Sequence, residues 1–241
     1  MLQKTRGIVL HHVRYGENSA IIYIFTEAFG RQSYLIQGIR KKKNTPSMSL
    51  LQPLSIHEME VYHKEGRELQ RIKEHRLNVI YQSIPYEIKK NTITLFLAEL
   101  LYRTLREEES NPPLFSFLIH AFQFFDTSME HTGNFHLWFM VQLTKHLGFY
   151  PDNNYSEKIN RFDLIKGKFV QIPIDAKYTL SKTYSEILNR FLASRLSDIS
   201  KISLKQENRT RIIETMLDYY AIHLEGMGKI KSLKVLREVF G

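Results

Sequence analysis

The chain has 241 residues, and its 34 Lys and Arg against 25 Asp and Glu give a formal net charge of +9 at pH 7. It contains no cysteine, which excludes disulfides, thiol catalysis and cysteine-based zinc sites. No stretch reaches the roughly 18 apolar residues of a membrane span, and the first residues lack the apolar core of a signal peptide. We therefore expect a cytoplasmic protein.

Positive charge is concentrated in two of three segments. Residues 1–80 contain 13 Lys and Arg against 7 Asp and Glu, a net +6, and residues 153–241 contain 16 against 10, also +6. Residues 81–152 contain 5 against 8, a net −3. This pattern is typical of a nucleic-acid-binding protein with a protein-interaction module between its basic parts. The alternative is a generally basic protein with no such role.

Residues 1–80 are predicted to form short strands separated by turns. Their apolar residues predict five strands, at 5–13, 19–26, 31–36, 50–62 and 68–76. In the third strand, Gln32, Tyr34 and Ile36 share one face, and Ser33 and Leu35 share the other. Five short strands with regular turns favour a small barrel. The OB-fold, which binds oligonucleotides, is the commonest such barrel, and an SH3-like barrel fits the pattern nearly as well.

From residue 81 the apolar period changes to that of helices. Helices are predicted at 85–106, 113–126, 134–147, 180–192, 203–226 and 233–240, with a capping box from Ser203 to Gln206. Residues 162–172 predict a small hairpin. We therefore expect an α+β protein with a five-stranded OB-fold domain at 1–80. A helical domain at 81–241 follows it, with a β-hairpin insert at about 152–179.

The third strand leads into a strongly basic loop. Gly38 permits a backbone bend, and Arg40, Lys41, Lys42 and Lys43 follow it. Four adjacent like charges repel one another, so a polyanion would relieve them, although a solvated loop tip is the alternative. We predict a DNA-binding surface made of this loop, nearby polar residues and two tyrosines that either stack on bases or pack in the barrel: Arg14, Tyr15, Arg31, Tyr34, Gln37, Arg40, Lys41, Lys42 and Lys43.

Short motifs are present along nearly the whole chain in a defined order. The first are Gly-Ile-Val-Leu at 7–10, Tyr-Gly-Glu-Asn-Ser at 15–19, Phe-Thr-Glu at 25–27, Gly-Arg at 30–31, Gly-Ile-Arg-Lys at 38–41 and Leu-Gln-Pro-Leu at 51–54. Later ones are Ala-Glu-Leu-Leu at 98–101, the segment 143–151 with its Leu-Gly-Phe-Tyr-Pro ending, and Lys-Ser-Leu-Lys-Val-Leu-Arg at 231–237. This ordered set resembles the RecO family of bacterial DNA repair proteins.

The resemblance implies a recombination mediator and not an enzyme. RecO-like proteins bind single- and double-stranded DNA, anneal complementary strands and, with RecR, help to load RecA onto DNA coated by single-stranded-DNA-binding protein. Association with the nucleoid follows from that role. The family also implies an N-terminal OB-fold, a helical domain and an insert that often holds zinc through four cysteines. This insert has no cysteine, so we expect no metal and no cofactor, with packing around Tyr155, Phe162 and Phe169 in their place.

The resemblance further implies a groove in the helical domain for the acidic tail of the single-stranded-DNA-binding protein. The candidates for this groove are Arg103, Phe139, Leu143 and Lys145. Most apolar side chains of a helical domain are core residues, and that remains the alternative for Phe139 and Leu143.

An enzymatic function finds little support in the motifs. His131 and His136 are five residues apart, whereas a helical metal-binding pair needs a spacing of four. The sequence contains no phosphate loop, nucleophile motif or dinucleotide fingerprint. The alternative from a different class is an RNA-binding OB-fold protein of translation or RNA processing. Comparing the affinities for single-stranded DNA and for RNA of the same sequence would distinguish the two.

Overall fold

The computed structural model describes residues 1–37, 51–129 and 132–240. Packing divides the chain into two compact units. The first comprises Met1–Thr127 and Ile230–Leu236, and the second comprises Ser128–Lys229 and Arg237–Gly241. The first unit thus contains the strands, two complete helices and the beginning of a third, whereas the change from strand to helical periodicity in the sequence lies at residue 80.

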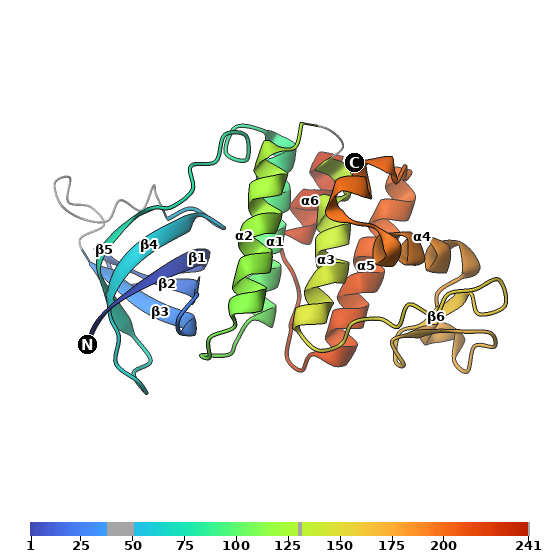
Figure 1. Cartoon of the computed structure of the whole chain (residues 1–241), viewed down its shortest axis with the longest axis horizontal. Coiled ribbons are helices and arrows are strands. Elements are labelled where there is room, and N and C mark those ends of the chain that lie inside the picture. The colour runs from blue at the N-terminus through green and yellow to red at the C-terminus, as the bar shows by residue number, and fades with distance from the viewer. Residues whose placement is uncertain (38–50, 130–131, 241) are drawn as a thin grey trace. The chain divides into compact units, whose positions relative to one another are not determined.

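The first unit begins with a closed five-stranded barrel (Figure 1). Its strands are β1 (Leu2–Arg14), β2 (Ser19–Thr26), β3 (Gly30–Gln37), β4 (Ile56–Tyr62) and β5 (Gln70–Leu77). They are hydrogen-bonded in the order β1-β2-β3-β5-β4, and β4 pairs back to β1. All neighbours are antiparallel except β3 and β5, which are parallel. This is the OB-fold predicted from the sequence.

Strand β1 closes the barrel by pairing on both of its edges. Its first half pairs with β4, from Leu2 to Ile8, and its second half pairs with β2, up to Arg14. The register with β2 shifts between Val9 and His11, which is a bulge. A bulge bends a strand and increases its twist, so one long strand can serve two partners around the barrel.

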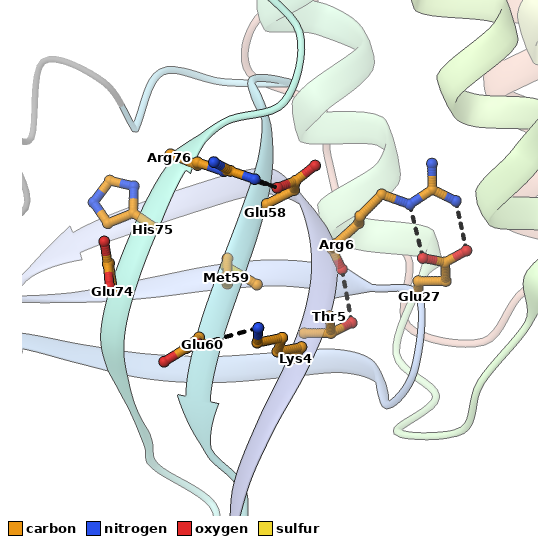
Figure 2. A pocket seen from close by; sticks show the side chains of 10 residues that line it. All are labelled: Lys4, Thr5, Arg6, Glu27, Glu58, Met59, Glu60, Glu74, His75 and Arg76. Atoms are coloured by element: carbon orange, nitrogen blue, oxygen red, sulfur yellow. Dashed lines mark hydrogen bonds and ion pairs between the residues drawn. The ribbon is translucent and has the colours of Figure 1, made fainter.

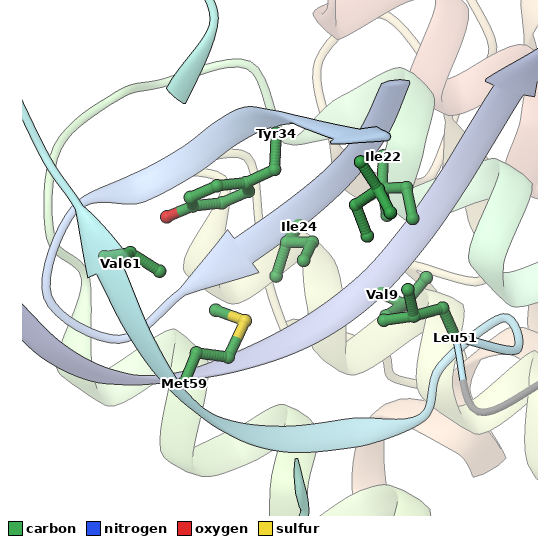
Figure 3. Close-up of a cluster of buried hydrophobic side chains, with 8 residues drawn as sticks. Val9, Ile22, Ile24, Tyr34, Leu51, Met59 and Val61 are labelled. Atoms are coloured by element: carbon green, nitrogen blue, oxygen red, sulfur yellow. The ribbon is translucent and has the colours of Figure 1, made fainter. Parts of the chain in front are cut away.

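Inward-facing apolar side chains fill the barrel (Figure 3). The alternation predicted for the third strand is confirmed, because Gln32, Tyr34 and Ile36 are buried while Ser33 and Leu35 are half-exposed. Each fully buried side chain of this kind contributes about 1.5–3 kcal/mol to folding. Since side chains occupy the interior, binding partners must use the outer faces or the ends of the barrel. The central cluster consists of Val9, Ile22, Ile24, Tyr34, Ile36, Leu51, Met59 and Val61.

A buried polar node joins the segment after the barrel to the end of helix α2. Helices α1 (Ile88–Thr104) and α2 (Pro112–Thr127) follow β5. The Asp126 carboxylate accepts backbone N–H groups of Gln82, Ser83 and Ile84 at 2.7, 2.9 and 2.9 Å. Lys90, which is 1% exposed, donates from Nζ to Ser83 Oγ at 2.6 Å and to the Asp126 carbonyl at 3.0 Å. Burial alone would raise the pKa of Asp126, but its hydrogen bonds hold that pKa below the ordinary value.

Two of the motif segments meet at the start of the last helix, α6 (Leu233–Phe240). The Glu99 carboxylate, on α1, accepts the backbone N–H groups of Lys231 and Ser232 at 2.9 and 2.8 Å. It also accepts the Ser232 hydroxyl at 2.6 Å. A carboxylate at this end of a helix is favourable because the first N–H groups have no helical partner. The Ala-Glu-Leu-Leu and Lys-Ser-Leu-Lys motifs therefore form one contact.

The second unit is mainly helical. Its helices are α3 (Phe135–His146), α4 (Lys182–Ala193) and α5 (Gln206–His223), with short 3-10 segments η1 (Thr132–Asn134), η2 (Ala176–Tyr178) and η3 (Leu196–Lys201). The capping box predicted at Ser203 is wrong. Extended backbone continues through Lys205, so α5 begins only at Gln206 and no side chain caps it. Within the described residues, no helix is both long and apolar enough to cross a lipid bilayer.

An aromatic cluster holds the insert of the second unit. Phe162 on β6 (Arg161–Asp163) and Phe169 on β7 (Lys168–Val170) are buried, with ring centroids 5.1 Å apart. Tyr155 meets Phe169 at 5.2 Å, and Tyr219 of α5 meets Phe162 at 5.6 Å. The Asn154 side chain bonds both the N–H and the carbonyl of Phe169. The predicted packing is confirmed, and in the described part of the chain no three His, Asp or Glu residues are grouped to hold a metal ion.

Candidate nucleic-acid interface

Strand register brings polar side chains from three strands to one end of the barrel. Arg14 at the end of β1 and Gln37 at the end of β3 lie on either side of the first residues of β2. Arg71, near the start of β5, pairs with Leu35 of β3. Neighbouring strands lie about 4.8 Å apart, so these side chains fall within a few strand spacings of one another. We call this surface the basic end, and its exposed members are Arg14, Tyr15, Gln37 and Arg71.

The β1–β2 hairpin presents an aromatic ring at the basic end. Tyr15 is 58% exposed, and its backbone N–H donates to the Ser19 carbonyl at 2.8 Å. Gly16 adopts a φ of +70°, which the turn requires and which glycine tolerates. Single-strand binders combine exposed aromatic rings, which stack bases, with cations that neutralise phosphates, and Arg14 and Tyr15 are both exposed. Tyr15 is therefore accessible, and its stacking on a base remains a prediction.

Arg31 is engaged in the fold of the first unit. Its Nη1 donates to the carbonyls of Tyr102 and Leu105, at 3.1 and 3.0 Å, at the C-terminal end of α1. Its guanidinium carbon lies 4.6 Å from the ring centroid of Tyr102 and 5.1 Å from that of Tyr23. A cation here satisfies carbonyls that have no helical partner and complements the helix dipole. We therefore assign Arg31 to capping α1, and its predicted phosphate contact stays a prediction.

The stacking role predicted for Tyr34 is wrong. Its ring is 0% exposed inside the barrel (Figure 3). Its hydroxyl has no hydrogen-bond partner among the described residues. Burial raises the pKa of this phenol well above its ordinary value. Tyr34 shares a strand face with Gln32 and Ile36, and that face is the inner one, so the ring packs where a base cannot reach it.

The four cations predicted to bind phosphates lie outside the described residues. They are Arg40, Lys41, Lys42 and Lys43, and they follow Gln37 by three to six positions in the sequence. Their contact with DNA remains a prediction.

The contribution of β5 to this surface could not be predicted from the sequence. In the described chain, β3 and β5 pair at two positions, Tyr34 with Gln70 and Leu35 with Arg71. The cations of β5 are visible in the sequence. That β3 lies next to them is not, because the β3–β5 pairing joins segments that are far apart along the chain. Beside this pairing lies a hollow of about 210 Å³, lined by Leu35, Ile36, Gln37, Arg71, Ile72 and Lys73.

A second outer surface of the barrel carries acids and bases in pairs (Figure 2). Arg6 donates to both carboxylate oxygens of Glu27, at 2.8 and 2.6 Å, which holds the pKa of Glu27 below its ordinary range. Arg76 donates to Glu58 at 2.8 Å. Because carboxylates already neutralise these cations, we expect this surface to attract phosphates less than the basic end does. Its hollow of about 530 Å³ is lined by Lys4, Thr5, Arg6, Glu27, Glu58, Met59, Glu60, Glu74, His75 and Arg76, and we call it the paired-charge face.

Two of the four residues predicted to hold a protein tail lack the exposure that this role needs. Phe139 and Leu143 are 0% exposed, so the prediction for these two is wrong. Their helix, α3, buries 9 of its 12 residues and is a core element of the second unit. Lys145 is exposed on the same helix. Arg103 lies on α1 of the first unit, half-buried, 3.9 Å from the Glu99 carboxylate.

Comparisons with known proteins agree along the chain. Residues 1–80 match the family model described as Recombination protein O N terminal, and residues 85–234 match Recombination protein O C terminal. The chain is 36% identical over 240 residues to the DNA repair protein RecO of Azobacteroides pseudotrichonymphae, covering 100% of both chains. It is 36% identical over 241 residues to that of Phocaeicola vulgatus and 30% over 244 residues to that of Porphyromonas gingivalis, again covering 100% of both chains. The names of these relatives describe DNA repair and state no catalytic reaction.

Proposed function

Because this chain belongs to the RecO family of DNA repair proteins, we propose that it mediates homologous recombination by binding DNA and without catalysing a reaction. It binds single- and double-stranded DNA and anneals complementary strands. With RecR, it helps to load RecA onto DNA coated by single-stranded-DNA-binding protein, and it associates with the nucleoid. The observation that supports DNA binding best is the basic end, where cations and an exposed tyrosine lie together on an OB-fold barrel.

The proposed contact is mainly electrostatic. Lysine and arginine side chains that neutralise phosphates release the counterions condensed on DNA, and this release drives binding. If Arg14 and the four cations at 40–43 each neutralise one phosphate, the single-strand salt slope is about −3.5. Affinity then falls roughly a hundredfold between about 50 and 200 mM salt.

Annealing needs no reactive group. Two complementary strands repel each other through their phosphates, and a cationic surface that holds both lowers that repulsion. The net charge of +9 suits this task. Base pairing then supplies the free energy, and the protein needs only to bring the strands together and release the duplex.

The proposed DNA site predicts a change in salt slope on removal of the basic run. We expect the variant with Arg40, Lys41, Lys42 and Lys43 all changed to alanine to bind a single-stranded oligonucleotide with a slope of about −0.7, because four of five neutralised phosphates are lost. Fluorescence anisotropy between about 50 and 200 mM salt measures the slope.

The matched control removes four positive charges elsewhere. Its substitutions to alanine are made at four exposed cations of the insert: Arg161, Lys166, Lys168 and Lys177. We expect this control to keep a slope near the wild-type value. If both variants lost the same amount of salt slope, the net charge of the protein, and not the basic run at residues 40–43, would determine binding.

A further inference from the structure

We propose that the hollow beside the β3–β5 pairing binds one unpaired nucleobase of the bound strand. This inference rests on the proposed DNA binding and adds to it a pocket for a base. Because a base in a duplex is stacked and paired, such a pocket makes the barrel selective for single strands.

The lining of the hollow combines apolar and polar groups as a base requires. Leu35 and Ile72 provide apolar side chains, and Ile72 packs against the core cluster of the barrel, which fixes its position. Gln37 and Arg71 are exposed at its rim. An amide carries both donors and an acceptor, so it can bond the edge of any base, and a planar guanidinium can stack on a base face.

The volume of the hollow suits a small ligand. At about 210 Å³ the hollow is smaller than the roughly 300–1,000 Å³ of clefts that enclose drug-sized molecules. Within the described residues, Ile36 and Gln37 have partners on β2 but none on β5, so the edges of two strands border the hollow. Their backbone groups add hydrogen-bonding capacity next to the rim.

Of the two cations that line the hollow, only Arg71 has a charge that no carboxylate neutralises in the described part of the chain. Lys73 is paired with Glu60 at 3.0 Å, whereas Arg71 makes no ion pair with any carboxylate in the described part of the chain. The hollow shares Gln37 and Arg71 with the basic end, so a strand whose phosphates contact the basic end has its bases within reach of the hollow.

The experiment compares two strands that differ only in their bases. Wild-type affinity is measured by anisotropy for an oligothymidylate and for an abasic strand of the same length. We expect the oligothymidylate to bind at least about fivefold more tightly, which is the lower end of what one stacked base contributes.

Variants that leave the fold intact identify the hollow. Arg71→Lys keeps the charge and removes the planar group, so we expect the base-dependent ratio to fall at least about threefold. Leu35→Asn, at a half-exposed position, tests the apolar wall and should lower the ratio as well. The matched control is Arg76→Lys on the paired-charge face, for which the ratio should stay at the wild-type value.

Each outcome separates this inference from the proposed function. A wild-type ratio near one, or a ratio that neither Arg71→Lys nor Leu35→Asn lowers, overturns the base pocket while DNA binding stands. Absence of binding to both strands overturns the proposed function and the pocket together.

Discussion

We expect the replacement of Gly30 with alanine to lower the free energy of unfolding by about 3 kcal/mol. Gly30 has a φ of +61°, which costs a residue with a Cβ about 1–2 kcal/mol. A methyl group here would also lie 2.6 Å from the Glu107 carbonyl oxygen and closer still to that of Glu109. These are backbone atoms, and they cannot move aside as the end of a flexible side chain can. The clash would disturb the bond from Arg31 N–H to the Glu107 carbonyl, at 2.9 Å, and with it the contact between barrel and helices.

Gly66 provides the matched control for Gly30→Ala. It has a φ of +72°, and a methyl group added at this position would meet nothing within 4 Å. Gly66→Ala should therefore lower the free energy of unfolding by about 1–2 kcal/mol, which is the cost of a positive φ for a residue with a Cβ. Urea unfolding of both variants measures the difference. Equal destabilisation would contradict the close packing of residues 107–109 against Gly30.

Replacing Asp126 with alanine should also lower the free energy of unfolding by about 3 kcal/mol, because three backbone N–H groups lose a charged acceptor in a buried node. Asp126→Asn keeps one acceptor oxygen and should lie between wild type and alanine. Glu186→Ala is the control, since its i,i+4 ion pair with Arg190 is exposed and contributes at most about 0.5 kcal/mol.

The same carboxylate gives the stability a defined pH dependence. The folded-state pKa of Asp126 lies below its ordinary value near 3.9, so the unfolded chain binds the proton more readily. The stabilisation by the Asp126 carboxylate is therefore complete above the pKa of this group in the unfolded chain. It is lost as the pH falls through the pKa of the group in the folded protein. We expect the difference in unfolding free energy between wild type and Asp126→Asn to shrink below about pH 4. A difference that grows on acidification would contradict the arrangement.

Strands and packing that depend only on residues close together in the sequence could be predicted from local patterns. Strand β2 runs from Ser19 to Thr26, as its dense apolar residues predict, and the alternation in β3 separates the buried from the half-exposed side chains. The aromatic packing of the insert also followed from its residue types. The capping box at Ser203 failed because residue types alone do not determine where a preceding extended segment ends.

Roles that depend on distant partners were not visible in the sequence. Arg31 stood in a basic region and was predicted to bind phosphate, but the helix end that it caps lies 71 to 74 residues further along. Tyr34 could be placed on a strand face, whereas its burial follows only from closure of the barrel. Arg71 joins the basic end through the parallel pairing with β3, which no local motif encodes.

Strand annealing tests the central claim most directly. Fluorescent complementary oligonucleotides are coated with the cognate single-stranded-DNA-binding protein and mixed with the wild-type chain or with the variant that has alanine at 40–43. We expect rapid annealing by the wild type and its loss in the variant at moderate salt. Annealing by both would retain the function and move the DNA site away from the barrel loop. A wild-type chain that neither binds nor anneals DNA would contradict the proposed role.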